Sequence, residues 1–208
     1  MVGADENLFF PRESKHDARL VLYYSSYLPL HGTETVVRAA RLVQDLAPDV
    51  HFRIIGNGIE YQHIRKISDE IRLQNTDFVT NVPLNELPQH ITEAALCLGG
   101  HFGKSSKAKR VIAGKTFQCL AMGKATIVGE NDANRELLSH GIDAWFCKMN
   151  DYESLAHSIL ELMDDSELRG RIGERAYQTF IEKGSYSALS TQLEAIVEEL
   201  FSRNIGYM

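Results

Sequence analysis

The chain has 208 residues, 44% of them hydrophobic and 24% charged, and its net charge is −6 at pH 7. This composition is typical of a soluble globular protein of one or two domains, and no apolar run approaches the ~20 residues of a membrane helix. The polar N-terminus is unlike a secretory signal, and the three scattered cysteines fit no disulfide framework or zinc spacing, so we expect a cytoplasmic protein. The acidic net charge argues against nucleic-acid binding.

Short apolar runs alternate with amphipathic stretches after a connector-like start, residues 1–17, which contains Pro11 and mixed charges. The apolar runs predict strands at residues 20–24, 52–55, 78–82, 95–98, 125–128 and 144–147. The amphipathic stretches predict one helix from about 33, a second up to about 73, and others at 86–93, 115–122, 135–138, 151–163, 166–183 and 189–201.

Regular alternation of strand and helix is typical of the α/β class. We therefore predict a Rossmann-like, doubly wound, mostly parallel sheet of about six strands, with helices on both faces and further helices at the C-terminal end. Ligands of such sheets bind beyond the carboxyl ends of the strands. Glycine-rich loops follow three predicted strands and should converge there, at Gly32, at Gly56 with Gly58, and at Gly99 with Gly103.

Known nucleotide and hydrolase motifs are incomplete in this sequence. The "GKS" at residues 103–105 would need a glycine five residues before Gly103 to be a P-loop, and that position is Leu98. The "GNG" at residues 56–58 lacks the third glycine of the dinucleotide fingerprint, because Tyr61 stands there. There is no Gly-x-Ser-x-Gly elbow and no Asp-x-Asp pair, so neither a serine hydrolase nor a carboxylate-bound metal–diphosphate site is expected.

A cationic segment stands out in this acidic chain. Residues 104–124 contain no Asp or Glu, and the rest of the chain therefore carries −12. The six cations of the segment are Lys104, Lys107, Lys109, Arg110, Lys115 and Lys124. Such an island attracts small anions, and its start beside a glycine-rich strand end favours a binding site over the alternative, a solvated basic face.

Four side chains near this edge suit a phosphorylated ligand. Lys115 and Gln118 lie one helical turn apart, and they offer a point charge for phosphate and an amide for a vicinal diol. His31 and His101 fall in the converging loops. The alternatives are solvent exposure for the first pair and loop histidines without chemistry for the second.

The segment "KAKRVIAGKTFQCLAMGKATIVGENDANRELLSHGIDAWF" resembles the signature region of glycosyltransferase family 4, in which the GT-B fold holds a nucleotide-sugar donor. "SSYLPLHGTETVVRAARLV" is similar to the first loop and helix of that family, and "RIIGNGIEY", "FVTNVPLNELPQHITEAALCL" and "DYESLAHSILELMDDSELRGRIGERA" match in order. The resemblance covers residues 2–184, and it implies the C-terminal, donor-binding half of a GT-B enzyme without the N-terminal acceptor half.

The resemblance implies a domain organisation and a reaction. Residues 1–17 would be a remnant of the interdomain connector, residues 18–184 the nucleotide-sugar-binding domain, and residues 185–208 a helix that crosses to the missing half. The reaction would transfer a sugar, with retention, from a UDP- or GDP-sugar to a glycan or lipid-linked acceptor in polysaccharide biosynthesis. No metal or other cofactor is implied, the catalytic histidine would belong to the missing half, and peripheral membrane association would run through that half.

The resemblance also assigns donor-binding residues. Arg110 and Lys115 would bind the diphosphate, assisted by the backbone N–H groups of Phe102 and Gly103. Gln118 would bind the ribose hydroxyls. At the two positions, eight residues apart, where the family has glutamates, this chain has Arg110 and Gln118. These replacements put the identity of the donor sugar and the retaining stereochemistry of the reaction in question.

The resemblance places the contacts to the nucleotide base, and the remaining contacts to the donor, in the other loops. Backbone near Val82 and Pro83 would contact the base. The further donor-binding residues expected are Ser26, His31, Gly32, Gly56 and His101. Ser26 and His31 replace an arginine and a lysine of the family's first loop.

Two other functional classes fit the same residues. The chain would be a non-catalytic nucleotide-binding module that works with a partner chain, or a complete phosphosugar or nucleotide enzyme of flavodoxin-like fold. An upstream Rossmann-like half in the same reading frame would favour the glycosyltransferase, and turnover by the isolated chain would favour the complete enzyme.

Overall fold

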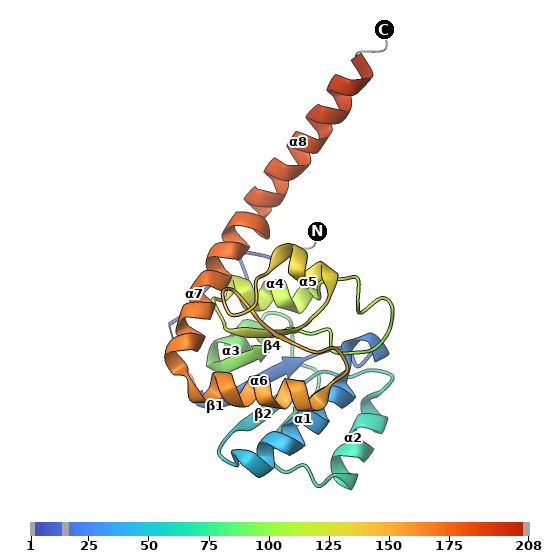
Figure 1. Ribbon diagram of the computed structural model, residues 1–208, viewed down its shortest axis with the longest axis vertical. Coiled ribbons are helices and arrows are strands. Elements are labelled where there is room, and N and C mark those ends of the chain that lie inside the picture. Colours follow the sequence, from blue (N-terminus) through green and yellow to red (C-terminus); the bar gives the residue numbers. More distant parts are fainter. Residues whose placement is uncertain (1–2, 14–16, 206–208) are drawn as a thin grey trace.

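The computed structural model describes residues 3–13 and 17–205, in which strands and helices alternate (Figure 1). The strands are β1 (Asp17–Tyr24), β2 (His51–Ile55), β3 (Thr76–Val79), β4 (Ala94–Leu98), β5 (Thr126–Gly129) and β6 (Trp145–Cys147). The helices are the 3-10 turn η1 (Pro29–His31), α1 (Thr33–Leu46), α2 (Tyr61–Glu70), α3 (Leu87–Glu93), α4 (Gly114–Ala121), α5 (Asp132–Leu137), α6 (Tyr152–Asp164), α7 (Ser166–Lys183) and α8 (Tyr186–Ile205).

The strands form one six-stranded sheet in the order β3-β2-β1-β4-β5-β6, and all neighbouring pairs are parallel. This order confirms the predicted doubly wound sheet. The chain runs outward from β1 to β3, returns to the centre, and runs outward in the other direction from β4 to β6. The chain therefore leaves β1 and β4 in opposite directions along the sheet, and this reversal point is where the fold leaves a crevice for a ligand.

Two apolar cores cover the two faces of the sheet. Side chains of β1 alternate between them: Val21 and Tyr23 pack with α1, α2 and α6, whereas Leu20, Leu22 and Tyr24 pack with α3, α4 and α7. Figure 1 shows α1, α2 and α6 on one side of the sheet and α4 and α5 on the other. Because both faces are covered, β1 is apolar without interruption from Leu20 to Tyr24.

Two elements end earlier than predicted, and left-handed backbone conformations explain why. The third strand was expected at residues 78–82, but β3 ends before Asn81, whose φ is +60°. The second helix was expected to reach about residue 73, but α2 ends before Arg72, whose φ is +53°. Strands and right-handed helices both require negative φ, so neither element continues through these residues.

Side-chain caps place the starts of the later helices. The Asp151 side chain accepts a hydrogen bond from the Ser154 N–H at 2.9 Å, which agrees with the predicted cap of α6. Asn131 caps α5 in the same way, by accepting from the Asn134 N–H at 2.7 Å. This second cap was not predicted, and it starts α5 at Asp132 instead of residue 135.

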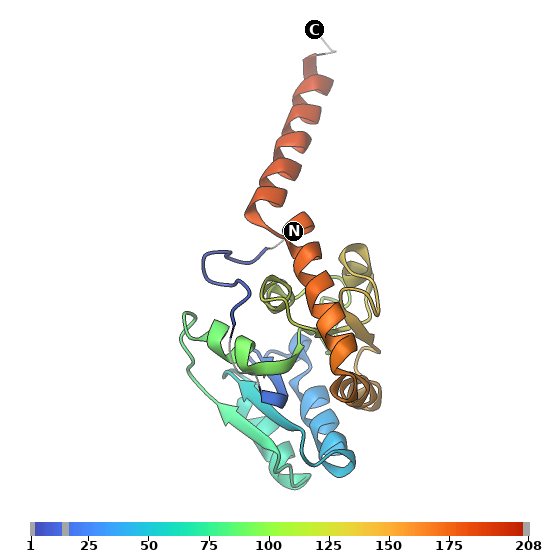
Figure 2. The same ribbon diagram turned by 90° about the vertical axis from the view of Figure 1, so that its left-hand side faces the viewer.

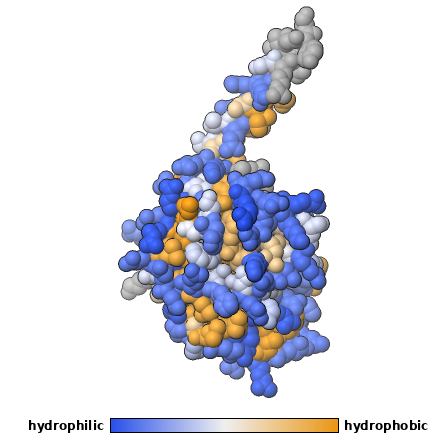
Figure 3. All heavy atoms as spheres, viewed as in Figure 1, coloured by the Kyte–Doolittle hydropathy of each residue, from blue (hydrophilic) through white to orange (hydrophobic). Residues whose placement is uncertain are grey.

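The two ends of the chain behave differently. Ala4 and Phe9, in the connector-like start, are buried in the core with α4 and α7. Helix α8 instead projects away from the domain (Figures 1 and 2), and its outer half carries exposed apolar side chains (Figure 3). Among the described residues, no helix combines the length and the apolar character needed to cross a membrane.

Candidate functional site

A cavity of about 650 Å³ lies at the carboxyl edge of the sheet, beyond the ends of the neighbouring strands β1 and β4. Its walls come from the loops after β1, β2, β3 and β4 and from the first turn of α4. The lining residues are Tyr24, Ser25, Ser26, His31, Ile55, Gly56, Asn57, Asn81, Val82, Leu84, Leu87, His101, Ala113, Gly114, Lys115 and Gln118. The loops thus converge as the sequence predicted.

Lys115 is the buried cation of this cavity. It lies in the first turn of α4 with 9% of its surface exposed. Its Nζ donates to the Tyr24 carbonyl oxygen at 2.9 Å and lies 4.0 Å from the centre of the Tyr23 ring. No carboxylate of the described chain forms an ion pair with it, and burial lowers the pKa of its ammonium group to about 7. An amine that lines a cavity without a counter-ion among the described residues is suited to receive an anion, whose charge would favour its protonated form.

The α4 end that carries Lys115 also lacks a cap. Its N-cap residue, Ala113, provides no side-chain hydrogen bond, and Ala113 and Gly114 both line the cavity. Free N–H groups and the helix dipole therefore add positive potential beside Lys115. The missing cap was not predicted, although the absence of Ser, Thr, Asp or Asn before the helix was a sequence signal for it.

His31 and His101 meet at the wall of the cavity. Their rings stack with centroids 5.2 Å apart and an interplanar angle of 3°. Burial, followed by the nearby Lys115 charge, lowers the pKa of His31 to about 3 and the pKa of His101 to about 4. Both imidazoles are therefore neutral at neutral pH in the ligand-free protein.

Gln118 follows Lys115 by one helical turn, as predicted, and also lines the cavity. Its Oε1 accepts a hydrogen bond from the Tyr24 hydroxyl at 2.9 Å. This bond orients the amide, so that its NH₂ group remains available to donate. Tyr24 was not singled out in the sequence, because a tyrosine at the end of an apolar strand is indistinguishable from a core residue.

The backbone N–H groups of Phe102 and Gly103 have a different role from the one expected. They donate to the carbonyl oxygens of His31 at 3.2 Å and Leu30 at 3.3 Å, so they are not free for a diphosphate. Gly32 adopts φ +68°, and a Cβ there would overlap the backbone of Phe102 and Gly103. These residues hold the two histidine loops together, and Gly32 and Gly103 line a separate cavity of about 700 Å³.

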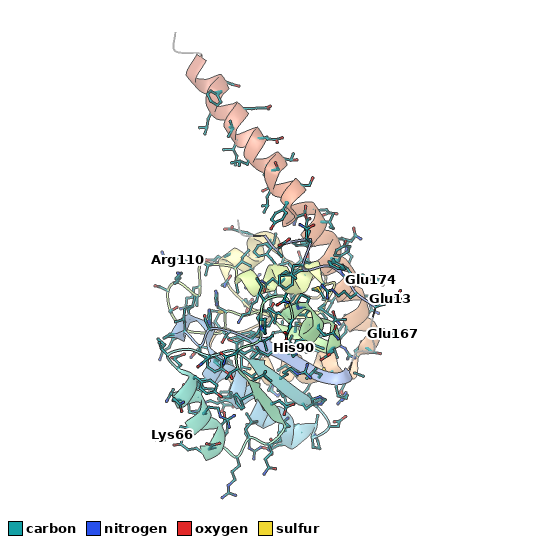
Figure 4. The ribbon with its side chains drawn as sticks, turned by 180° about the vertical axis from the view of Figure 1, so that it is seen from behind. Glu13, Lys66, His90, Arg110, Glu167 and Glu174 are labelled. Carbon is teal, nitrogen blue, oxygen red and sulfur yellow. The ribbon has the colours of Figure 1, made fainter. Side chains whose placement is uncertain are left out.

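Two more predicted residues lie outside the main cavity. Arg110 is exposed on the loop before α4 (Figure 4), and its Nε donates to the Ser106 carbonyl oxygen at 3.2 Å. Pro83 is exposed, and its carbonyl oxygen accepts from the backbone of the turn that begins α3. The predicted residues that do line the cavity are Ser26, His31, Gly56, Val82, His101, Lys115 and Gln118.

Within the described residues, no group of three or more His, Cys, Asp or Glu side chains is arranged to hold a metal ion. Cys97, Cys119 and Cys147 are free and buried. The positive groups at the cavity are thus Lys115 and the start of α4, and the chemistry that this arrangement supports is binding of a small, multiply charged anion such as a diphosphate.

Comparison with known proteins agrees with this geometry. Residues 4–179 match the family model described as glycosyl transferases group 1. The chain belongs to this family. It is 24% identical over 183 residues to the poly(glycerol-phosphate) alpha-glucosyltransferase of Bacillus subtilis, and the alignment covers 82% of this chain and 26% of that protein. It is 23% identical over 203 residues to the phosphatidyl-myo-inositol mannosyltransferase of Mycolicibacterium smegmatis, and this alignment covers 94% of this chain and 48% of that protein.

Solved structures show the same fold at low sequence identity. The Anabaena protein Alr3699/HepE, crystallised with UDP, superposes with a TM-score of 0.79 at 15% identity, over 95% of this chain and 56% of that one. The C-terminal domain of the group 1 protein LpcC from Francisella tularensis superposes with a TM-score of 0.72 at 15% identity, over 88% of this chain and all of that domain. The group 1 chain described here spans a quarter to about half the length of the curated relatives it matches.

Proposed function

We propose that this chain is the donor-binding, C-terminal half of a group 1 glycosyltransferase that takes a sugar from a UDP- or GDP-sugar. The observation that carries the proposal is Lys115, a buried lysine that pairs with no carboxylate of the described residues, beside an uncapped helix start in a cavity at the turning point of the sheet. UDP in the structure of the similar Anabaena protein supports a nucleotide donor.

The proposed reaction follows from the chemistry of the leaving group. When the bond between sugar and diphosphate breaks, negative charge grows on the phosphate oxygens. A fixed ammonium group and oriented N–H dipoles stabilise that charge more in the transition state than in the ground state, which lowers the barrier. Lys115 and the start of α4 would supply this stabilisation, so the proposal requires no metal ion.

The rest of the donor would occupy the remaining walls of the cavity. Gln118 would donate its amide N–H to the ribose hydroxyls, because its Oε1 is already held by Tyr24. The backbone near Val82 would contact the base, next to the apolar surfaces of Leu84 and Leu87. Arg110 would take part only if the loop before α4 moves toward a bound donor.

The acceptor half and the acceptor itself are also part of the proposal. Relatives named for a poly(glycerol-phosphate) substrate and a phosphatidyl-inositol substrate support a glycan or lipid-linked acceptor. A C-terminal domain of similar shape, crystallised alone, supports the division into two halves. We propose transfer with retention in polysaccharide biosynthesis on the cytoplasmic side, peripheral membrane association through an N-terminal half, and no turnover by the C-terminal half alone.

Calorimetric titration with UDP, GDP and ADP tests donor binding. At least one of them should bind, and Lys115→Met should weaken binding at least about tenfold, since a charge-assisted contact contributes ~1.5–3 kcal/mol. Lys66→Met is the matched control, because Lys66 is an exposed lysine on α2 (Figure 4) and should leave binding unchanged.

Folding of the Lys115 variant is checked in the same samples. Replacing a buried, unpaired ammonium group by an apolar side chain of similar length should leave the melting temperature of the ligand-free protein equal or higher. If none of the three nucleotides binds, the proposed function is wrong. If the complete protein binds a nucleotide but transfers no sugar, the chain is instead a nucleotide-binding module.

A further inference from the structure

The stacked histidines form an unusual wall for a cavity that receives an anion. His31 and His101 come from the loops after β1 and β4, the two strands that flank the crevice. His101 is only 6% exposed, and its Nδ1 is buried without a hydrogen-bond partner. The Nδ1 of His31 has a partner, because it accepts from the Leu28 N–H at 3.4 Å. The two rings are therefore not equivalent.

The charged groups that face this pair are cations. The charge of Lys115, on α4, lowers the pKa of both rings, and the charge of Lys107, on the loop before α4, lowers the pKa of His101. From β1, the neutral Tyr23 hydroxyl donates to the carbonyl oxygen of His31 at 3.0 Å. No carboxylate among the described residues pairs with either ring. In the ligand-free protein, burial and the nearby lysine charges keep the imidazoles unprotonated. The negative charge of a bound diphosphate would act in the opposite direction and favour their protonation.

We infer that the stacked pair His31–His101 takes up one proton from solvent when a diphosphate binds beside Lys115, and that the resulting imidazolium binds the phosphate that leaves with the nucleotide. This inference rests on the proposed function. The bond that forms is one N–H bond on the His101 ring, the proton comes from water or buffer, and nothing is oxidised or reduced.

Stacking limits the uptake to one proton. Two imidazolium rings in contact would repel each other, so the pair titrates as one unit. His31 is the less suitable acceptor because its Nδ1 already accepts the Leu28 N–H. Once protonated, His101 has two N–H donors, and one of them can bind a phosphate oxygen. His101 would thus add a positive charge to the site only when the ligand is present.

Proton uptake on UDP binding is measured by calorimetry at pH 6.5 in two buffers of different ionisation enthalpy. The wild-type protein should take up at least about half a proton more per UDP than the His101→Asn variant. UDP and Lys115 titrate near this pH as well, but they are common to both proteins, so the difference reports the histidine pair. His157→Asn, which changes an exposed histidine on α6, is the matched control and should behave as wild type.

The pH profile separates this role from a structural one. His101→Asn should weaken UDP binding about tenfold at pH 6.5 and much less at pH 8.5, where proton uptake by the pair contributes less. Equal uptake by wild type and variant, with UDP bound to both, would overturn the inference and leave the proposed function intact. The inference would also be overturned, with the proposed function intact, if the wild-type protein took up no proton when it binds UDP. This outcome can be read without any variant. Failure of UDP, GDP and ADP to bind at all would remove both proposals.

Discussion

Gly32 connects the backbone conformation of one residue to the shape of the candidate site. Its φ of +68° lies in the left-handed region, and a Cβ would overlap the backbone of Phe102 and Gly103. Only glycine therefore lets the loop after β1 touch the loop after β4. That contact includes the hydrogen bond from the Phe102 N–H to the His31 carbonyl oxygen, and it brings His31 and His101 into their stack.

Substitution of Gly32 tests this connection. Gly32→Ala should cost at least ~2 kcal/mol, because backbone strain and steric overlap add, and it should also weaken UDP binding. Gly170→Ala is the matched control: Gly170 lies in the exposed part of α7 with nothing within 4 Å of an added Cβ. It should stabilise the protein by ~0.5–1 kcal/mol. Thermal unfolding measures both, and equal melting temperatures for the two variants would contradict the role of Gly32.

The hydrogen bond that anchors helix α8 to the domain lies at its beginning. The Ser185 Oγ accepts a hydrogen bond from the Ala188 N–H at 3.1 Å, and Ser185 itself is buried. Farther along, the exposed apolar residues are Leu193, Ile196, Val197, Leu200 and Phe201. Because a helix without tertiary contacts has little stability of its own, we predict that the outer half of α8 frays in the isolated chain.

Truncation and amide exchange measure this prediction. Removal of residues 191–208 should change the melting temperature by less than about 1 °C, since the side chains described in this stretch are exposed. Phe180→Ala, which empties a buried position at the end of α7, should cost ~3–5 kcal/mol and serves as the contrast. Strong exchange protection of α8 in a monomer would show that it is packed and not frayed.

The strand order places four loops around one cavity. β1 and β4 are neighbours in the sheet, although β2 and β3 lie between them in the chain, so the loops after all four strands open at the same edge. The second cavity lies nearby and is lined by Gly32 and Gly103, which belong to the loops after β1 and β4. It lies against the start of α1, and its lining includes Glu34, Arg38 and Glu60. Its two acidic side chains offset its two cations, Arg38 and Lys104, so the second cavity is less favourable for a diphosphate than the main one, whose lining contains Lys115 and no Asp or Glu.

Amide exchange with and without UDP distinguishes the two cavities. UDP should slow exchange in the loops after β1, β2, β3 and β4 and in the first turn of α4, all of which line the main cavity. The first turns of α1 should be unchanged, because α1 contributes to the second cavity but not to the main one. Protection at α1 without protection at α4 would place the ligand in the wrong cavity for the proposed function.

Much of the fold and part of the site followed from the sequence. Apolar runs and helical periodicity predicted the six strands and the main helices, because burial on both faces of a parallel sheet imposes that pattern on the chain. The spacing of Lys115 and Gln118 placed them on one helical face, and glycines marked the loops that converge. These are local signals, and they depend on residues that are close together in the chain.

Contacts between distant segments decided the rest. The sequence could not tell that the N–H groups of Phe102 and Gly103 are used by the loop after β1 or that Arg110 lies outside the cavity. Nor could it tell that Lys115 is buried with no carboxylate beside it in the part of the chain that the structure describes. Hydrogen-bond partners and desolvation depend on which remote groups arrive at a position once the sheet has formed. For this reason the elements could be predicted from local pattern, whereas the electrostatics of the candidate site emerged only with the packing of the four loops against α4.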